Sequence, residues 1–181
     1  MFDDIDKISW AKLKQAHGNS EHVPSAIKGL VSNDEKEQEA SYWKLDNHVV
    51  LQGDLYQAAF YVIPFLLEIL AASIRNGRSY VYDLLFEIAN GFAPEEVPCD
   101  YDGVTLTLTE GCKRAVADGL HLYLEEISDS NSVCRENALD LIVSLEEYAK
   151  NAVPRLIELK DKEVNPEFQS KLEEAIAEIG D

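Results

Sequence analysis

The sequence predicts an all-α protein, a HEAT-like α-solenoid of paired antiparallel helices that forms a single domain over residues 1–181. The first observation behind this prediction is a short proline-centred pattern that occurs three times, at Pro24, Pro64 and Pro154. These prolines lie 40 and 90 residues apart, close to one and two periods of a helical-pair repeat. The second observation is that apolar residues recur at helical spacing in the stretches between them.

The proline pattern is best explained by three helix starts. In each copy Val or Ile precedes the proline, and apolar residues follow two and three places after it. A proline inside a helix costs about 3 kcal/mol, whereas in the first turn an amide has no intrahelical acceptor to lose. We therefore expect Pro24, Pro64 and Pro154 each to lie in the first turn of a helix. Three unrelated helices that happen to carry first-turn prolines are the alternative.

Apolar periodicity and capping signals divide the remaining chain into helices. Gly18 and Gly91 are expected to end two helices, and Asn33 is expected to cap a third. Pro64 splits one continuous apolar pattern into two helices. The expected helices are 6–17, 20–32, 34–51, 54–61, 63–75, 79–90, 110–128, 132–149, one that begins at Pro154, and one capped by Asn165-Pro166. The side chains expected to be largely buried are Trp10, Trp43, Phe65, Leu66, Leu84, Leu141 and Leu172.

One segment, 91–109, breaks the helical rhythm. It contains Pro94, Pro98 and Gly103, which preclude a long helix, and it ends in a Val/Thr/Leu alternation that favours a short extended stretch. This irregular insertion carries four acids and no base. Long loops in compact proteins are often functional, so the insertion is a candidate site, with a solvated connector as the alternative.

Acidic residues dominate the chain. Asp and Glu number 34 against 16 Lys and Arg, which gives a net charge of −18. The excess is present throughout and is steepest over 121–181, where 15 acids meet 6 bases. Such a field repels phosphate, so no nucleic-acid partner is expected. It would attract a basic protein and speed its association, while solubility alone is the alternative explanation.

The sequence carries no recognisable catalytic motif. A phosphate-binding glycine loop, a Gly-x-Ser-x-Gly elbow and a His-Glu-x-x-His helix are all absent, so we expect no enzyme and no cofactor. Cys99, Cys112 and Cys134 lack Cys-x-x-Cys spacing, which favours free thiols over a disulfide or zinc site. His17 and His22 are better explained by a helix cap and a surface residue than by a metal site.

The chain shows neither a bilayer span nor a secretory signal. It contains no stretch of about 18 uncharged apolar residues, and its start is acidic where a signal would be basic. We therefore expect a cytoplasmic protein without a membrane partner.

Part of the chain resembles a known family. Residues 9–75 are similar to the N-terminal region of bacterial HEAT-like proteins, and repeat character returns at 132–180. Such proteins occur among the immunity proteins of polymorphic-toxin and contact-dependent growth inhibition systems. The resemblance therefore implies a HEAT-like fold and an immunity role. It rests on Trp10-Ala11, Leu13, Ala16-His17-Gly18, Val23-Pro24, Gln52-Gly53, Leu55-Tyr56, Ala58 and Ile63-Pro64-Phe65-Leu66.

The leading functional hypothesis is an immunity protein that binds and neutralises a cognate toxin domain. A basic nuclease is the first candidate, because a nuclease must hold phosphates and an acidic inhibitor complements that surface. A generic HEAT-repeat adaptor or assembly factor is the alternative, but it leaves the charge unexplained. A DNA-repair glycosylase on a HEAT-like scaffold is disfavoured by the scarcity of Lys and Arg.

The insertion is the first candidate for the partner-binding site. Its acids can pair with the basic groups of a nuclease, and its aromatics offer the anchors that interfaces favour. The candidate residues are Phe92, Glu95, Glu96, Asp100, Tyr101 and Asp102. The acidic start of the helix expected at 34–51 is the secondary candidate, although a solvated face that suits the helix dipole explains it equally well. Its residues are Asp34, Glu35, Glu37 and Glu39.

Overall fold

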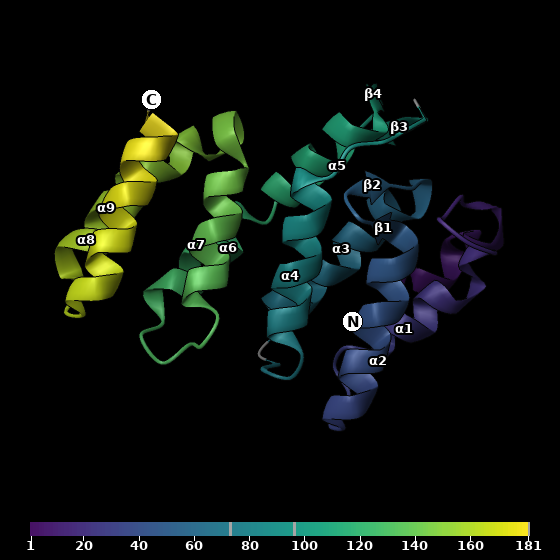
Figure 1. The fold of residues 1–181 in the computed structure, drawn as a ribbon, viewed down its shortest axis with the longest axis horizontal. Coiled ribbons are helices and arrows are strands. Elements are labelled where there is room, and N and C mark those ends of the chain that lie inside the picture. The colour runs from purple at the N-terminus through teal and green to yellow at the C-terminus, as the bar shows by residue number, and fades with distance from the viewer. Residues whose placement is uncertain (73, 96, 181) are drawn as a thin grey trace. The chain divides into compact units, whose positions relative to one another are not determined.

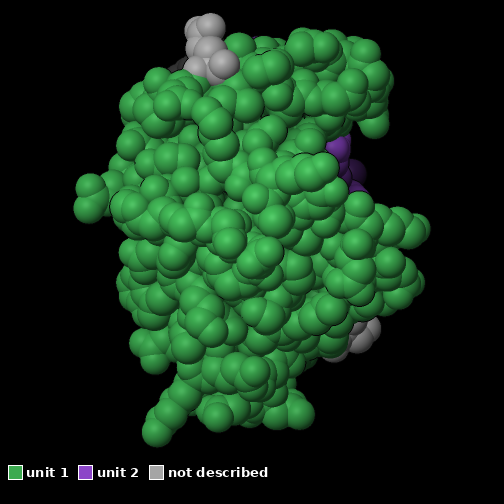
Figure 2. All heavy atoms as spheres, turned by 90° about the vertical axis from the view of Figure 1, so that its right-hand side faces the viewer, with its two compact units in different colours: residues 1–116 green, residues 117–181 purple. Residues whose placement is uncertain are grey.

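The computed structural model describes residues 1–72, 74–95 and 97–180, and within these ranges the protein is mostly helical (Figure 1). Two small two-stranded sheets accompany the helices. The prediction of an all-α protein is confirmed at this level. A single domain over 1–181 was predicted, whereas the contacts divide the chain into two compact units, 1–116 and 117–181, coloured separately in Figure 2.

Unit 1 is built from helices that pack as consecutive pairs. Helix α1 packs against α2 and α3 against α4, and further contacts join α1 to α3 and α2 to α4. Among the described residues, one antiparallel hairpin, β1 with β2, lies between α2 and α3 in sequence, and another, β3 with β4, lies between α4 and α5. The bounds are α1 Val23–Gly29, α2 Glu35–Val49, β1 Val50–Leu51, β2 Asp54–Leu55, α3 Gln57–Ala71, α4 Arg78–Asn90, β3 Pro98–Tyr101, β4 Val104–Thr107 and α5 Leu108–Ala117.

Unit 2 pairs α6 (Leu120–Ser128) with α7 (Arg135–Ser144) and α8 (Val153–Lys162) with α9 (Pro166–Gly180). A 3-10 stretch, Glu146–Ala152, joins the two pairs. Arg135 ties the unit together, because its Nε donates to the Ile127 carbonyl at 2.8 Å and its guanidinium lies 3.9 Å from the Phe168 ring centroid. The same guanidinium forms an ion pair with Glu163. Burial acts to raise the pKa of Glu163, but the hydrogen bond and charge of Arg135, together with hydrogen bonds from the Asn165 and Val164 backbone, outweigh it and the net pKa is lowered.

Two of the three prolines begin helices as predicted, and one does not. Pro24 and Pro154 lie in the first turn of α1 and α8. Pro64 lies inside α3, which runs unbroken where two helices, 54–61 and 63–75, were expected. The proline costs about 3 kcal/mol there, whereas each buried Val, Leu, Ile or Phe contributes about 1.5–3 kcal/mol. The buried apolar face of α3 therefore outweighs the break, and Pro64 itself is exposed.

The helix expected at 6–17 is not formed. Two 3-10 turns, Ile5–Lys7 and Trp10–Lys12, replace it. The buried indole of Trp10 donates to the Ile5 carbonyl at 2.7 Å, which holds the first turn against the second. Downstream, Ala16 donates its backbone N–H to the His48 carbonyl. Backbone groups that a helix would have used internally are thus bonded to distant segments.

Three further expectations need correction. The helix expected at 110–128 is divided into α5 and α6 by Asp118-Gly119. The cap of α2 is Asp34, whose side chain accepts from the Lys36 N–H at 3.0 Å, and not Asn33. Trp43 is 50% exposed, although it was expected to be buried. Ser41 and Leu45 lie on the buried side of α2, and Trp43 lies about 200° around the helix from Ser41, on the opposite side.

The other core predictions are confirmed. The predicted side chains that are buried are Trp10, Phe65, Leu66, Leu84, Leu141 and Leu172.

Replacing Pro64 should stabilise the protein. Pro64→Ala restores the amide that can donate to the carbonyl of Phe60, four residues earlier, and it disturbs no buried side chain. We expect the free energy of unfolding to rise by about 1–3 kcal/mol in urea denaturation. Pro154→Ala is the matched control, because this exposed first-turn proline should change stability by less than about 0.5 kcal/mol. A loss of stability in Pro64→Ala would show that packing requires the proline geometry.

Candidate partner-binding site

The insertion begins on a fixed backbone. Phe92 donates its N–H to the Gly53 carbonyl and accepts from the Leu55 N–H, both at 2.8 Å. Gly91 makes this approach possible, because a Cβ at this position would lie 2.8 Å from the Leu55 side chain. The Phe92 side chain is 59% exposed. Its backbone is therefore fixed while its ring, a predicted interface anchor, is open to solvent.

The second half of the insertion is a β-hairpin. Strands β3 and β4 are joined at Asp102-Gly103, whose φ angles are 50° and 79°. Two central residues with positive φ define the turn type that suits a two-residue hairpin, and Asp-Gly is among its preferred sequences. Asp100 supports the turn by accepting the Gly103 N–H at 3.1 Å. The sequence pattern predicted only a short extended stretch here, although the Asp-Gly pair between apolar alternations is a signal for a hairpin.

Helix α5 holds this hairpin in place. Gly111 lies so close to β3 that a Cβ would meet the Cys99 Sγ at 2.1 Å. The Arg114 guanidinium lies 4.6 Å from the Tyr101 ring centroid. Tyr101 was proposed as an exposed anchor, but it is half-buried and already covered by a cation. Burial raises the pKa of the Cys99 thiol, which keeps it in the unreactive neutral form.

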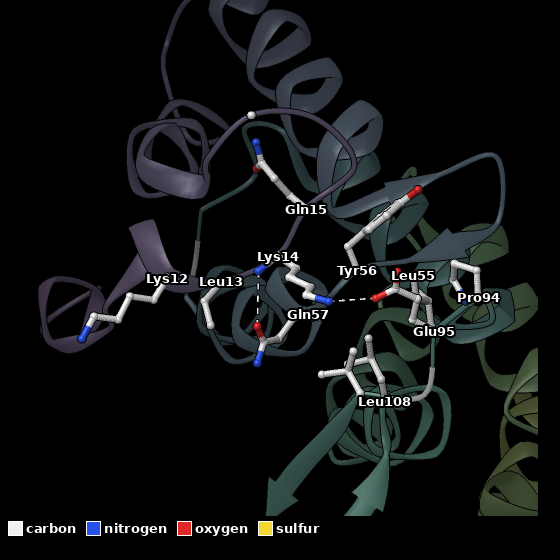
Figure 3. Close-up of a pocket in the computed structure, with 12 residues that line it drawn as sticks. Lys12, Leu13, Lys14, Gln15, Leu55, Tyr56, Gln57, Pro94, Glu95 and Leu108 are labelled. Atoms are coloured by element: carbon white, nitrogen blue, oxygen red, sulfur yellow. Dashed lines mark hydrogen bonds and ion pairs between the residues drawn. The ribbon is translucent and has the colours of Figure 1, made fainter.

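A pocket of about 460 Å³ lies at the base of the insertion (Figure 3). Lys14 reaches across it to Glu95, with 2.8 Å between Nζ and Oε2, and the backbone N–H of Lys14 donates to Gln57 at 3.2 Å. The ion pair is exposed and therefore contributes little to stability. Its hydrogen bond and charge lower the pKa of Glu95. The described lining residues are Lys12, Leu13, Lys14, Gln15, Gly18, Leu55, Tyr56, Gln57, Pro94, Glu95, Val97 and Leu108.

The insertion is thus less negative than its own sequence implies. Lys14 forms an ion pair with Glu95, and the Arg114 guanidinium lies over the Tyr101 ring. Both bases come from outside the insertion. Asp100 is engaged in the turn, while Asp102 is exposed at its tip. Glu96 lies outside the described residues. The structure therefore supplies one cation to Glu95 and one to the Tyr101 ring beside the hairpin turn.

The secondary candidate, 34–39, lies at the first turns of α2. Asp34 caps the helix, and Glu37 accepts from the Ser32 hydroxyl at 2.5 Å. Glu35 and Glu39 are exposed. Two of the four carboxylates therefore serve local capping bonds at the positive end of the helix dipole.

Two neighbouring histidines, His17 and His22, meet His48 in the last turn of α2. The ring centroid of His48 lies 4.6 Å from that of His22 and 6.5 Å from that of His17. Burial, followed by the proximity of His22, lowers the pKa of His48. His17 is not at a helix end, because no helix forms at 6–17. Within the described residues, no group of three or more His, Cys, Asp or Glu side chains has an arrangement that could hold a metal ion.

Comparison with models of protein families and with curated proteins finds no match. Among the described helices, none combines the length and apolar character needed to cross a bilayer.

The packing of Gly111 on Cys99 can be tested by a double-mutant cycle. Gly111→Ala should push the hairpin away from α5 and lower the free energy of unfolding by about 1–3 kcal/mol, despite the better helix propensity of Ala. Cys99→Ala removes the opposing sulfur, so Gly111→Ala/Cys99→Ala should regain most of that loss. Urea denaturation measures both steps. Equal losses with and without Cys99 would place the strain elsewhere.

Proposed function

We propose that this protein acts by binding, as an immunity protein that neutralises a cognate basic toxin domain in the cytoplasm. The observation that carries the proposal is a net charge of −18 on a packed helical scaffold. Such a field accelerates association with a basic partner and disfavours acidic ones. A nuclease is the first candidate for the partner, because its phosphate-binding cleft must be basic.

The packing of consecutive helices supports a HEAT-like scaffold for this role. In unit 1 α1 packs against α2 and α3 against α4, and in unit 2 α6 packs against α7 and α8 against α9, and pairing of consecutive helices is what a HEAT-like scaffold requires. Repeat scaffolds of this type present rigid surfaces to other macromolecules. In this proposal the insertion, with Phe92 exposed at its start and Asp102 exposed at the tip of its hairpin, is the part that enters or covers the toxin site. Blocking then needs no cofactor and no chemistry by this chain.

Binding to the toxin should depend strongly on salt. We expect one-to-one inhibition, with the Kd rising by at least about tenfold between 50 and 500 mM NaCl, since screening weakens attraction between exposed charges. Calorimetry with the purified toxin domain measures the affinity and stoichiometry. Survival of cells that express the toxin together with this chain tests the immunity role directly. Salt-independent binding would contradict the electrostatic mechanism, and unprotected cells would contradict the immunity role.

Neutralising the acids of the insertion should weaken that binding. The variant Glu95→Gln, Glu96→Gln, Asp100→Asn, Asp102→Asn keeps side-chain size, and Asn tolerates the positive φ of position 102. We expect a loss of affinity above tenfold, or about 1.4 kcal/mol, with little change in thermal stability.

The control makes the same change in charge on exposed positions of α9, at Glu167, Glu173, Glu174 and Glu178, each replaced by Gln. It should lose far less affinity than the insertion variant. Equal losses in the two variants would mean that net charge alone matters. An unaltered affinity in the insertion variant would move the contact to another surface.

A further inference from the structure

The surface where α2 packs against α4 carries a cluster of aromatic rings. The Tyr42 ring lies between two others, 5.1 Å from the stacked ring of Tyr80 and 4.9 Å from Trp43, which meets it edge-on. Both helices are labelled in Figure 1. Trp43 is half exposed although it is among the largest apolar side chains. The helices thus hold a preformed aromatic surface open to solvent.

Trp43 lies off the buried side of α2, so its large side chain adds little to the core of unit 1. The core side of α2 is occupied by Leu45 and Val49, and Trp43 points away from it. Trp and Tyr are enriched among the few residues that dominate binding energy at protein interfaces, because they bury a large area at low entropic cost. An exposed Trp supported by two Tyr rings is therefore suited to be an interface anchor.

Carboxylates surround this aromatic cluster. Asp46 lies one helical turn after Tyr42, and Tyr80, Asp83 and Glu87 follow one another along one side of α4 at i, i+3 and i+7. The pKa of Tyr42 is raised to about 12 by burial and by the charges of Asp46, Asp83 and Glu87. All three carboxylates are therefore close enough to act on one hydroxyl. Within the described residues, no ion pair joins Asp46 or Glu87 to a basic side chain.

These two carboxylates are held at a cost to the free protein. Burial raises the pKa of Asp46, and burial together with repulsion from Asp46 and Asp83 raises that of Glu87. When the pKa of a carboxyl is higher in the folded than in the unfolded state, the folded protein loses stability as the pH rises from the unfolded-state pKa to the folded-state pKa. Ionisation of both groups as pH rises through that interval therefore opposes folding. A cation placed between them would offset this cost.

We propose that this α2–α4 face, formed by Tyr42, Trp43, Asp46, Tyr80 and Glu87, is a docking surface for an arginine-bearing segment of a protein partner. The inference rests on the proposed function and adds a second contact surface to it. Guanidinium groups stack on aromatic faces and bind carboxylates through two parallel hydrogen bonds, so one Arg side chain can use both features of the face. A second copy of this chain fits poorly, because both copies carry the same large acidic excess.

The two tryptophans provide a direct test by NMR. The probe is an acetylated hexa-arginine amide peptide, titrated into the full-length protein labelled with ¹⁵N. The indole N–H signal of Trp43 should shift in a saturable way. The indole of Trp10 is buried and hydrogen-bonded to the Ile5 carbonyl, so its signal should stay in place and serves as an internal control. Absence of a Trp43 shift, or equal shifts of both signals, would overturn the proposal.

Two variants separate the face from net charge. Asp46→Asn/Glu87→Gln and Trp43→Ala should each raise the Kd for the peptide, measured by calorimetry because Trp43→Ala has no indole signal at this position, by at least about fivefold, a loss on the scale of one interface anchor. Glu173→Gln/Glu174→Gln makes the same change in charge as the first variant on exposed positions of α9 and should raise it by less than about twofold. Equal effects of the two double variants would sink the proposal.

Thermal unfolding shows whether the variants fold and checks the proposed cost of the carboxylates. Asp46→Asn/Glu87→Gln should raise the thermal midpoint by about a degree or more, because it removes two unfavourably placed charges. A lower midpoint would contradict the argument. A Trp43 signal that moves with protein concentration alone would identify a second copy as the occupant and overturn the assignment to an arginine-bearing partner.

The outcome for the face is distinguishable from the outcome for the proposed function. If the toxin domain is inhibited normally by Asp46→Asn/Glu87→Gln and by Trp43→Ala, the face is not its contact, and the immunity role stands. If wild-type protein neither binds nor protects against the toxin while the peptide still shifts Trp43, the proposed function fails and the docking surface remains.

Discussion

The short β1–β2 hairpin is the structural constraint on which unit 1 depends. Backbone hydrogen bonds bring distant segments to this hairpin and to the residues on either side of it: Ala16 to the His48 carbonyl, Ala58 to the Lys14 carbonyl, and Phe92 to Gly53 and Leu55. The N-terminal segment, the start of α3 and the insertion are thereby held at one place. Amides unused by helices find partners here, as buried backbone groups must.

This arrangement explains why the insertion differs from a free acidic loop. Its first residues are pinned to the hairpin, and its last strand passes directly into α5, which supplies Arg114 above Tyr101. The N-terminal segment supplies Lys14 to Glu95 because that segment is fixed against the start of α3. The same contacts that make the insertion rigid also reduce its negative charge. Rigidity favours binding by lowering its entropic cost, whereas the lost charge weakens attraction at long range.

The α2–α4 face, unlike the insertion, keeps the charge of its carboxylates. Its aromatic rings are ordered by stacking between two helices, while Asp46 and Glu87 have no compensating base within the described residues. A carboxylate that is partly desolvated and has no ion-pair partner is unfavourable in the free protein and becomes favourable once a cation binds it. The insertion thus offers a rigid shape with modest negative charge, and the α2–α4 face offers uncompensated negative charge with aromatic anchors. The two surfaces lie in the same unit.

The sequence by itself determined the helical class, most helix positions, the irregularity of the insertion and nearly all predicted core residues, because periodicity, first-turn prolines and caps act over a few neighbouring residues. Tertiary structure alone decided whether Pro64 breaks a helix, since the answer depends on how much of α3 is buried. It also decided the exposure of Trp43 and the pairing of Lys14 with Glu95. These outcomes depend on groups far apart in the chain, whose free energies of burial and pairing are set only when the segments meet.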